Sequence, residues 1–168
     1  MRSELAQGAW LVSPLFVGFV LHGVSIRHGL LRTLARPIDR GALVRQRRLF
    51  GDNKTYRGVV CVALGTMLGF VALTAMRDPT EQSALAALPS GSFAALLGLG
   101  VGGAAMLAEL PNSALKRQLD IQPGTQGSGL SALLFHVLDQ IDVLAGAWLV
   151  LAIFVSATPR LVLGSALF

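Results

Sequence analysis

The chain has 168 residues, of which 53% are hydrophobic and 14% are charged, and its formal net charge is +5. Because soluble domains carry about 25% charged residues, this composition excludes an ordinary soluble protein and indicates a membrane protein. The basic charge would make nucleic acid a candidate partner of a soluble chain; here its distribution matters more, and we expect no nucleic acid partner. The single cysteine, Cys61, excludes an internal disulfide and a thiolate metal site.

Four uncharged stretches each approach the roughly 20 residues that cross a bilayer as a helix. They cover residues 5–26, residues 59–76, a window within residues 82–108, and residues 143–159. We therefore predict an all-α, polytopic membrane bundle with four full spans, forming one domain over residues 1–168. The apolar segment 161–168 is too short to cross, and it is either an interfacial end or the start of a further helix.

Basic residues are concentrated between the first two spans, where residues 27–57 contain nine Lys or Arg and only two Asp. Cytoplasmic loops are enriched in Lys and Arg, so we predict that residues 27–58 are cytoplasmic, as is the loop of residues 112–138 after the third span. The N-terminus then lies outside the cell membrane, and the two polar loops face each other on its inner side.

Glycine pairs four residues apart occur in the second and third spans, at Gly65 and Gly69 and at Gly98 and Gly102. Residues 98–103 also match the dinucleotide-binding pattern G-x-G-x-x-G, but that pattern needs a preceding strand, which a membrane span does not provide. We interpret these glycines as positions where helix backbones approach closely.

The first loop ends in a segment that mixes an acid, an amide, a hydroxyl and two cations, just before the second span. Its candidate substrate-binding residues are Asp52, Asn53, Lys54, Thr55 and Arg57. The cations and the hydroxyl suit phosphate oxygens, so this segment indicates a shaped binding site. For the arginines of residues 27–48 we favour a simpler role, contact with anionic headgroups, where each cation contributes about 1 kcal/mol.

A polar stripe emerges from the third span. Glu109, Asn112, Ser113 and Lys116 follow steps of three and four residues, which place them on one face of a helix. Pro111 within the stripe bends a helix and frees a carbonyl. An acid near the membrane boundary is costly unless it is paired or bound to a cation, so we expect Glu109 to be functional.

Two carboxylates, Asp139 and Asp142, lie one helical step apart at the start of the predicted fourth span. Like charges so placed repel each other, and a shared hard cation such as Mg²⁺ would offset that repulsion. The alternative is a solvated helix start, where acidic residues favour the positive end of the helix dipole. The glycine-rich connection of residues 122–129 either folds over a substrate or is an ordinary connector.

With these residues assigned, the chain resembles the CDP-archaeol synthase family, relatives of the phosphatidate cytidylyltransferases. Five elements occur in the family's order along most of the chain. They are Pro37-Ile38-Asp39, residues 51–58, residues 109–117, Pro123-Gly124 and residues 138–142. The last element has Gln140 where the wider superfamily has Arg. Members of the family have five spans, whereas this chain stops eight residues into what would be the fifth.

The resemblance implies transfer of CMP from CTP to a lipid phosphate, giving a CDP-lipid and pyrophosphate in phospholipid biosynthesis. It also implies catalytic roles for five residues, namely Lys54, Lys116, Arg117, Asp139 and Asp142. The implied metal ligands for Mg²⁺ are Asp139, Asp142, Glu109 and Asn112, with Ser113 among the substrate-binding residues. A phosphate monoester is already an anion at neutral pH, so positioning and charge neutralisation suffice for catalysis.

The expected partners are CTP and a lipid phosphate, either an ether-linked archaeal one or a phosphatidate, and a homodimer is an open option. A second hypothesis is a non-catalytic membrane module that binds anionic lipid or a partner through the basic loop. The two hypotheses differ in geometry. An enzyme requires residues 52–57, Glu109, Lys116, Asp139 and Asp142 to converge on one cavity, whereas a module does not.

Overall fold

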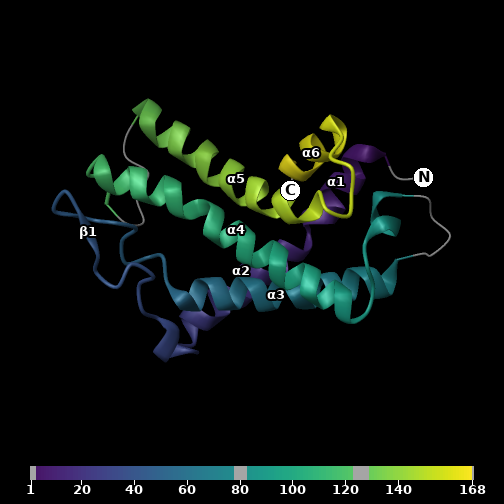
Figure 1. The fold of residues 1–168 in the computed structure, drawn as a ribbon, viewed down its shortest axis with the longest axis horizontal. Helices are drawn as coiled ribbons and strands as arrows, with labels where there is room; N and C mark the ends of the chain where they lie inside the picture. Colours follow the sequence, from purple (N-terminus) through teal and green to yellow (C-terminus); the bar gives the residue numbers. More distant parts are fainter. Residues whose placement is uncertain (1–2, 78–82, 123–128, 168) are drawn as a thin grey trace.

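The computed structural model describes residues 3–77, 83–122 and 129–167, and these form a mainly helical molecule (Figure 1). The six α-helices are α1 (Glu4–Val12), α2 (Pro14–Arg27), α3 (Tyr56–Met76), α4 (Ser92–Gln118), α5 (Gly129–Leu151) and α6 (Pro159–Ala166). The shorter elements are the 3-10 helices η1 (Arg32–Leu34) and η2 (Ala84–Ala87) and the strands β1 (Leu43–Val44) and β2 (Arg47–Arg48).

The helices pack in chain order, α2 on α3, α3 on α4 and α4 on α5, while α6 returns to pack on α1 (Figure 1). Four helical segments are long and apolar enough to cross a membrane: Glu4–Arg27, Tyr56–Met76, Ser92–Gln118 and Leu133–Leu151. The predicted all-α bundle with four spans is therefore confirmed. Its core is formed by apolar side chains such as Leu11, Val62, Phe70, Val101 and Leu151.

The paired glycines hold the central helices together. A side chain at Gly65 or Gly69 would meet the backbone of α2, and one at Gly98 or Gly102 would meet the backbone of α3. Small residues allow such close approach in membranes, where van der Waals packing supplies much of the association energy. The prediction that these are packing glycines is confirmed.

The first span consists of two helices in sequence. Ser3 caps α1 by accepting a hydrogen bond from the amide of Ala6, and α1 ends at Val12. Pro14 occupies the first turn of α2, a position where its missing N–H costs no helical hydrogen bond. The break at Ser13 therefore separates a short outer helix from the longer α2.

The predicted fourth span, residues 143–159, is wrong at both ends. The helix α5 begins at Gly129 and ends at Leu151, so Asp139 and Asp142 lie inside the helix and not at its start. The two acids do not interrupt the helix, since Asp139 is paired with groups on α4. At the other end the chain turns before Thr158, which caps α6 by accepting a hydrogen bond from the amide of Leu161. Much of the expected loop 112–138 is likewise helical.

The apolar C-terminal segment forms the short helix α6, and the choice between an interfacial end and the start of a further span stays open. Trp148 of α5 donates a hydrogen bond to the hydroxyl of Ser165 at 2.9 Å, which ties α6 to α5. On its other side α6 crosses α1 at Gly8 and Gly164, where an added Cβ atom would overlap the facing backbone. The helix is thus fixed from two directions.

The loop between α2 and α3 has a defined structure. Its strands β1 and β2 form a hairpin in which Leu43 pairs with Arg48 and Val44 with Arg47 (Figure 1). The amide of Ile38 donates to the carbonyl of Lys54 at 2.8 Å. This contact places residues 37–39 directly beside the predicted phosphate-binding segment.

Candidate active site

The centre of the site is a contact between α4 and α5. The Lys116 Nζ atom lies 2.6 Å from each carboxylate oxygen of Asp139, and the side-chain amide of Asn112 donates to Asp139 Oδ1 at 2.8 Å. The side chain of Lys116 is only 8% exposed, whereas that of Asp139 is 40% exposed. A buried cation is therefore held by a carboxylate that remains open to a ligand.

A second ion pair joins the first loop to the same face of α4. Lys54, just before α3, donates to Glu109, and both side chains are largely buried. Glu109, Asn112 and Lys116 thus form the predicted polar stripe, and Ser113 is buried beside it. The stripe makes contacts in two directions, toward the loop and toward α5.

Asp142 completes this group. It lies within electrostatic range of Asp139, Lys116 and Lys54, and therefore beside both ion pairs. We refer to the group as the polar cluster. Its members are Lys54, Glu109, Asn112, Lys116, Asp139 and Asp142. Of residues 52–57, Lys54 thus joins Glu109, Lys116, Asp139 and Asp142, whereas Asp52 lines a separate cavity, so the expected convergence on a single cavity stays a prediction.

Two oxygen atoms of the polar cluster fit a hard cation. Asp142 Oδ2 and Asn112 Oδ1 are buried, and among the described residues neither accepts a hydrogen bond. Carboxylate and amide oxygens are the ligands that Mg²⁺ prefers, and Mg²⁺ is commonly held by one or two carboxylates together with substrate phosphates. Within the described ranges no three His, Cys, Asp or Glu side chains form a group that could hold a metal. The donor set therefore suits a cation that substrate oxygens also bind.

The loop beside the cluster is organised around Asp39, whose side chain is fully buried. Its carboxylate accepts hydrogen bonds from Arg48 at 2.6 and 3.3 Å, and from the amides of Gly41, Phe50 and Gly51 at 3.0 to 3.1 Å. Burial alone would raise the pKa of Asp39, but Arg48 and the three amides outweigh it and hold that pKa well below its usual value.

Arg47 and Arg48, for which the sequence favoured contact with headgroups, both bind acids within the protein. Arg48 binds Asp39 and also Asp52, the latter at 2.7 Å. Arg47 donates to Asp120 and to the carbonyl of Gln118, which fastens the β1–β2 hairpin to the end of α4. Oxygen atoms of the protein itself therefore serve as acceptors for both arginines.

A cavity of about 260 Å³ lies between the β1–β2 hairpin and the end of α4. Arg117 lines it together with Arg48, Gly51 and Asp52, so this pair of predicted residues, Asp52 and Arg117, is brought together here. Arg117 is buried, and its Nε and Nη1 atoms have no acceptor among the residues that the structure describes. An anionic group that enters the cavity would find this guanidinium available.

The remaining predicted residues have local roles or lie at the surface. Thr55 caps α3 by accepting a hydrogen bond from the amide of Gly58 at 3.2 Å. Arg57 approaches the carbonyl of Leu30 at 3.5 Å, and Asn53 is exposed. The connection of residues 122–129, for which a substrate lid and an ordinary connector were both left open, falls largely outside the described residues.

Sequence reasoning assigned no site role to Asp39 or Arg48. Asp39 stands in the Pro37-Ile38-Asp39 element, and it is one of only two acids among nine cations. An acid in so basic a segment has many cations nearby, so Asp39 could have been identified from sequence as a candidate for an internal ion pair.

The fold and the polar cluster define a multi-pass membrane protein with a charged site where the basic loop of residues 27–57 meets two spans. A family model described as CarS-like, CDP-archaeol synthase, matches residues 10–166. The chain belongs to the CDP-archaeol synthase family.

Individual relatives agree with this assignment. A CDP-archaeol synthase from Halobacterium salinarum is 37% identical over 125 residues, which is 73% of this chain and 62% of that protein. Another from Halorubrum lacusprofundi is 35% identical over 139 residues, covering 81% of this chain and 71% of the relative. The chain thus spans less than two thirds of the length of the Halobacterium protein.

A solved structure supports the fold. It is described as "Structural insight into an intramembrane enzyme for archaeal membrane lipids biosynthesis" and superimposes with a TM-score of 0.63 at 24% identity. The match covers 94% of this chain and 84% of that chain. The arrangement of helices in Figure 1 is therefore one that an intramembrane enzyme adopts.

Proposed function

We infer that this protein transfers CMP from CTP to a lipid phosphate of the membrane, forming a CDP-lipid in phospholipid biosynthesis. The observation that carries the proposal is the polar cluster, in which two lysines are held by carboxylates at the junction of the first loop, α4 and α5. The relatives named CDP-archaeol synthase support an ether-linked lipid phosphate as the acceptor.

In the proposed reaction an oxygen of the lipid phosphate attacks the α-phosphorus of CTP. A new P–O bond forms there, the bond to the β-phosphate oxygen breaks, and pyrophosphate leaves with the electron pair. The attacking oxygen is already anionic, so none of the chain's residues has to remove a proton. What the chain must supply is charge neutralisation and alignment.

The lysines are suited to that task because each is already oriented. Asp139 holds Lys116, and Glu109 holds Lys54, so neither ammonium group has to be ordered when the phosphates arrive. Pre-organised cations stabilise developing charge without a reorganisation cost at the moment of reaction. Arg117, in the adjoining cavity, adds a third cation for the nucleotide.

A divalent cation fits the same site. Asp142 and Asn112 would hold it through their buried oxygens, with Asp139 adjacent. When bound, Mg²⁺ would supply Lewis-acid stabilisation of phosphate charge. Glu109 is engaged by Lys54, and its predicted part in the metal site therefore depends on exchange of that partner.

We also propose that the loop of residues 27–58 and the connection after α4 face the cytoplasm, with the N-terminus outside. Support comes from the nine cations of residues 27–57, a bias typical of cytoplasmic loops. CTP is a cytoplasmic nucleotide, so this orientation would bring it to the side where Lys54 and Lys116 lie.

The non-catalytic alternative is not favoured. A lipid-binding module would keep its basic side chains free for headgroups, whereas Arg47 and Arg48 are bound to acids within the protein. It would also give no reason for two lysines to be buried against carboxylates at a membrane boundary, which is a costly arrangement.

The test is an assay of the purified chain in liposomes with CTP and Mg²⁺. The acceptors are an ether-linked lipid phosphate and an ester-linked phosphatidate, offered separately, and both pyrophosphate and CDP-lipid are measured. We expect stoichiometric formation of the two products and loss of both after chelation of divalent ions. The proposal would be rejected if neither product formed with the ether-linked acceptor and neither formed with the ester-linked acceptor. Glu4→Gln, at the far end of α1, is the control variant.

A further inference from the structure

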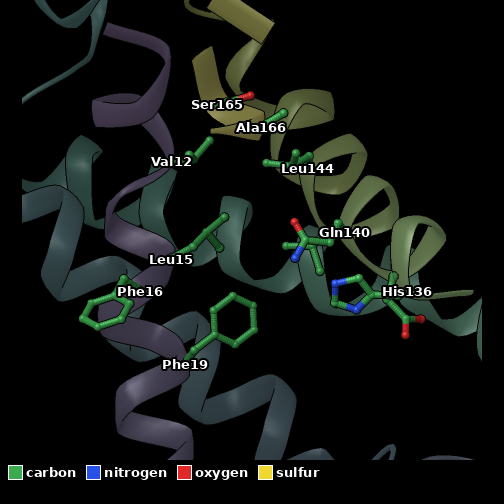
Figure 2. A pocket seen from close by; sticks show the side chains of 11 residues that line it. Val12, Leu15, Phe16, Phe19, His136, Gln140, Leu144, Ser165 and Ala166 are labelled. Atoms are coloured by element: carbon green, nitrogen blue, oxygen red, sulfur yellow. The ribbon is translucent and has the colours of Figure 1, made fainter. Parts of the chain in front are cut away.

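A largely apolar groove lies beside the polar cluster. It lies between α1, α2, α5 and α6 and has a volume of about 340 Å³, within the range of about 300–1,000 Å³ typical of small-molecule sites (Figure 2). Its walls are mostly apolar side chains contributed by these four helices. They include Val12, Leu15, Phe19, Val143 and Leu144.

The two ends of the groove differ in chemistry. His136 and Gln140 lie at one end (Figure 2). Asp139, the carboxylate that binds Lys116, stands between them in α5 and also lines the groove. The opposite end is formed by Ser165 and Ala166 of α6. The groove therefore extends from the polar cluster to the end that α6 forms.

The α6 end of the groove offers little hydrogen bonding to a polar ligand. The Ser165 hydroxyl donates to the carbonyl of Val162 at 2.6 Å and accepts from Trp148, so both of its hydrogen-bonding roles are in use. A polar group in the groove would lose its water without gaining a partner there, which is costly. A hydrocarbon chain would incur no such cost.

We propose that this groove holds one hydrocarbon chain of the acceptor lipid and that α6 is the end wall limiting the length of that chain. The inference rests on the proposed function, since it needs a lipid phosphate at the polar cluster. The phosphate would lie at the end lined by Asp139, next to the Lys116 that this carboxylate binds, and the chain would extend along α2 and α5 toward Ala166.

The end wall is firm enough to act as a limit. Gly8 of α1 faces the backbone at Leu161, and Gly164 faces the backbone at Leu5, so α1 and α6 touch with no side chain between them. Trp148 holds α6 from the side of α5. A chain too long for the groove cannot push α6 aside without breaking these contacts.

Filling the end of the groove tests the inference. In Ala166→Trp the indole would occupy the end of the groove, while Leu163→Trp places the same side chain on the exposed side of α6 as a matched control. Each variant is assayed with a short-chain and a long-chain lipid phosphate that share one headgroup and one linkage. Transfer of CMP and the thermal unfolding midpoint are both measured.

We expect Ala166→Trp to raise KM for the long-chain acceptor by about tenfold or more, the scale on which apolar pockets discriminate methylene groups. KM for the short-chain acceptor and KM for CTP should stay near wild type, and Leu163→Trp should resemble wild type with both acceptors. Leu144→Phe, which narrows the groove from α5, provides a second variant should Ala166→Trp fold poorly, and the same selectivity is expected.

Equal effects of Ala166→Trp on the two acceptors would overturn the inference, as would no effect on either. A drop in unfolding midpoint with no acceptor selectivity would also overturn it, because it would indicate a structural bilayer lipid in the groove. In each of these outcomes wild-type transfer continues, so the proposed function survives. Failure of wild type with every acceptor would instead reject the proposed function itself.

Discussion

Asp39 and Asp139 are both acids paired with a cation near the membrane boundary, yet their surroundings differ. Asp39 has no exposed side-chain surface, and its two oxygens accept from Arg48 and three backbone amides. Asp139 is 40% exposed and accepts only from side chains, Lys116 and Asn112. Beside it, Asp142 keeps a buried oxygen without a donor in the described parts of the chain.

The contrast separates a structural acid from one suited to binding. A carboxylate enclosed by backbone donors is fully satisfied and fixes the path of the chain, whereas one held by mobile side chains can exchange partners when phosphates or a cation arrive. Substitutions at Asp39 should therefore act first on the loop's stability, and substitutions at Asp139 first on turnover. Four predictions test this division.

The largest effect is expected for Asp139→Asn. The change keeps the shape of the side chain but removes the charge that orients Lys116. We expect CMP transfer to fall by about 10²–10³, comparable to loss of one pre-organised electrostatic contact, and the unfolding midpoint to fall as well because the buried Lys116 loses its partner. Turnover near the wild-type rate would show that Asp139 belongs to the structural class.

The next effect is the destabilisation of the first loop by Asp39→Asn. Arg48 would lose its buried partner, and the loop would lose stability, though less than for a fully buried pair because Arg48 is 31% exposed and keeps Asp52. Hydrogen exchange at the amides of Gly41, Phe50 and Gly51 should become faster, with amides inside α4 unchanged as the internal reference. Unaltered exchange at the three loop amides would contradict the assignment.

Acid should open the same loop. The folded pKa of Asp39 lies below its usual value, so its charged form contributes stability fully above the unfolded pKa of about 4 and loses that contribution as pH falls below it. Pepsin cleavage within residues 39–51 should therefore increase as pH is lowered from about 4. In Asp39→Asn the cleavage should already be fast and change little with pH. A wild-type loop with no acid dependence would argue against the pair.

The smallest effect is expected for Arg47→Ala. Arg47 and Asp120 are 40% and 69% exposed, and exposed ion pairs contribute about 0–1 kcal/mol. The unfolding midpoint and KM for CTP should both remain near wild type, and high salt should erase any residual difference. A large loss of CTP affinity would mean that the hairpin contacts the nucleotide directly.

Much of the fold follows from the sequence because long uncharged stretches have few alternatives to spanning helices. The first two spans were predicted within a few residues of α1–α2 and α3, while the third, a window within residues 82–108, overlaps α4 but stops ten residues before its end. The fourth was misplaced because hydropathy counts Asp139 and Asp142 as charges and cannot register that Lys116 and Asn112 satisfy Asp139. Pairing across helices is information that a single segment does not carry.

For the site, spacing along the chain was informative where one helix was involved. Steps of three and four predicted that Glu109, Asn112 and Lys116 share a face, and the structure has them in one cluster. Residue spacing could not predict that Arg48 faces Asp39. The hairpin that turns Arg48 toward Asp39 has positive φ angles at Arg45 and Gln46, and such residues seldom adopt positive φ angles.

Because α1 and α6 pack backbone to backbone at Gly8 and Gly164, each of these helices supports the position of the other. Shortening the chain ahead of α2 would leave α6 without its main support, even though more than 140 positions separate the two segments in the 168-residue sequence. Selectivity for the acceptor, as proposed above, would then depend on the contact between α1 and α6, away from the polar cluster.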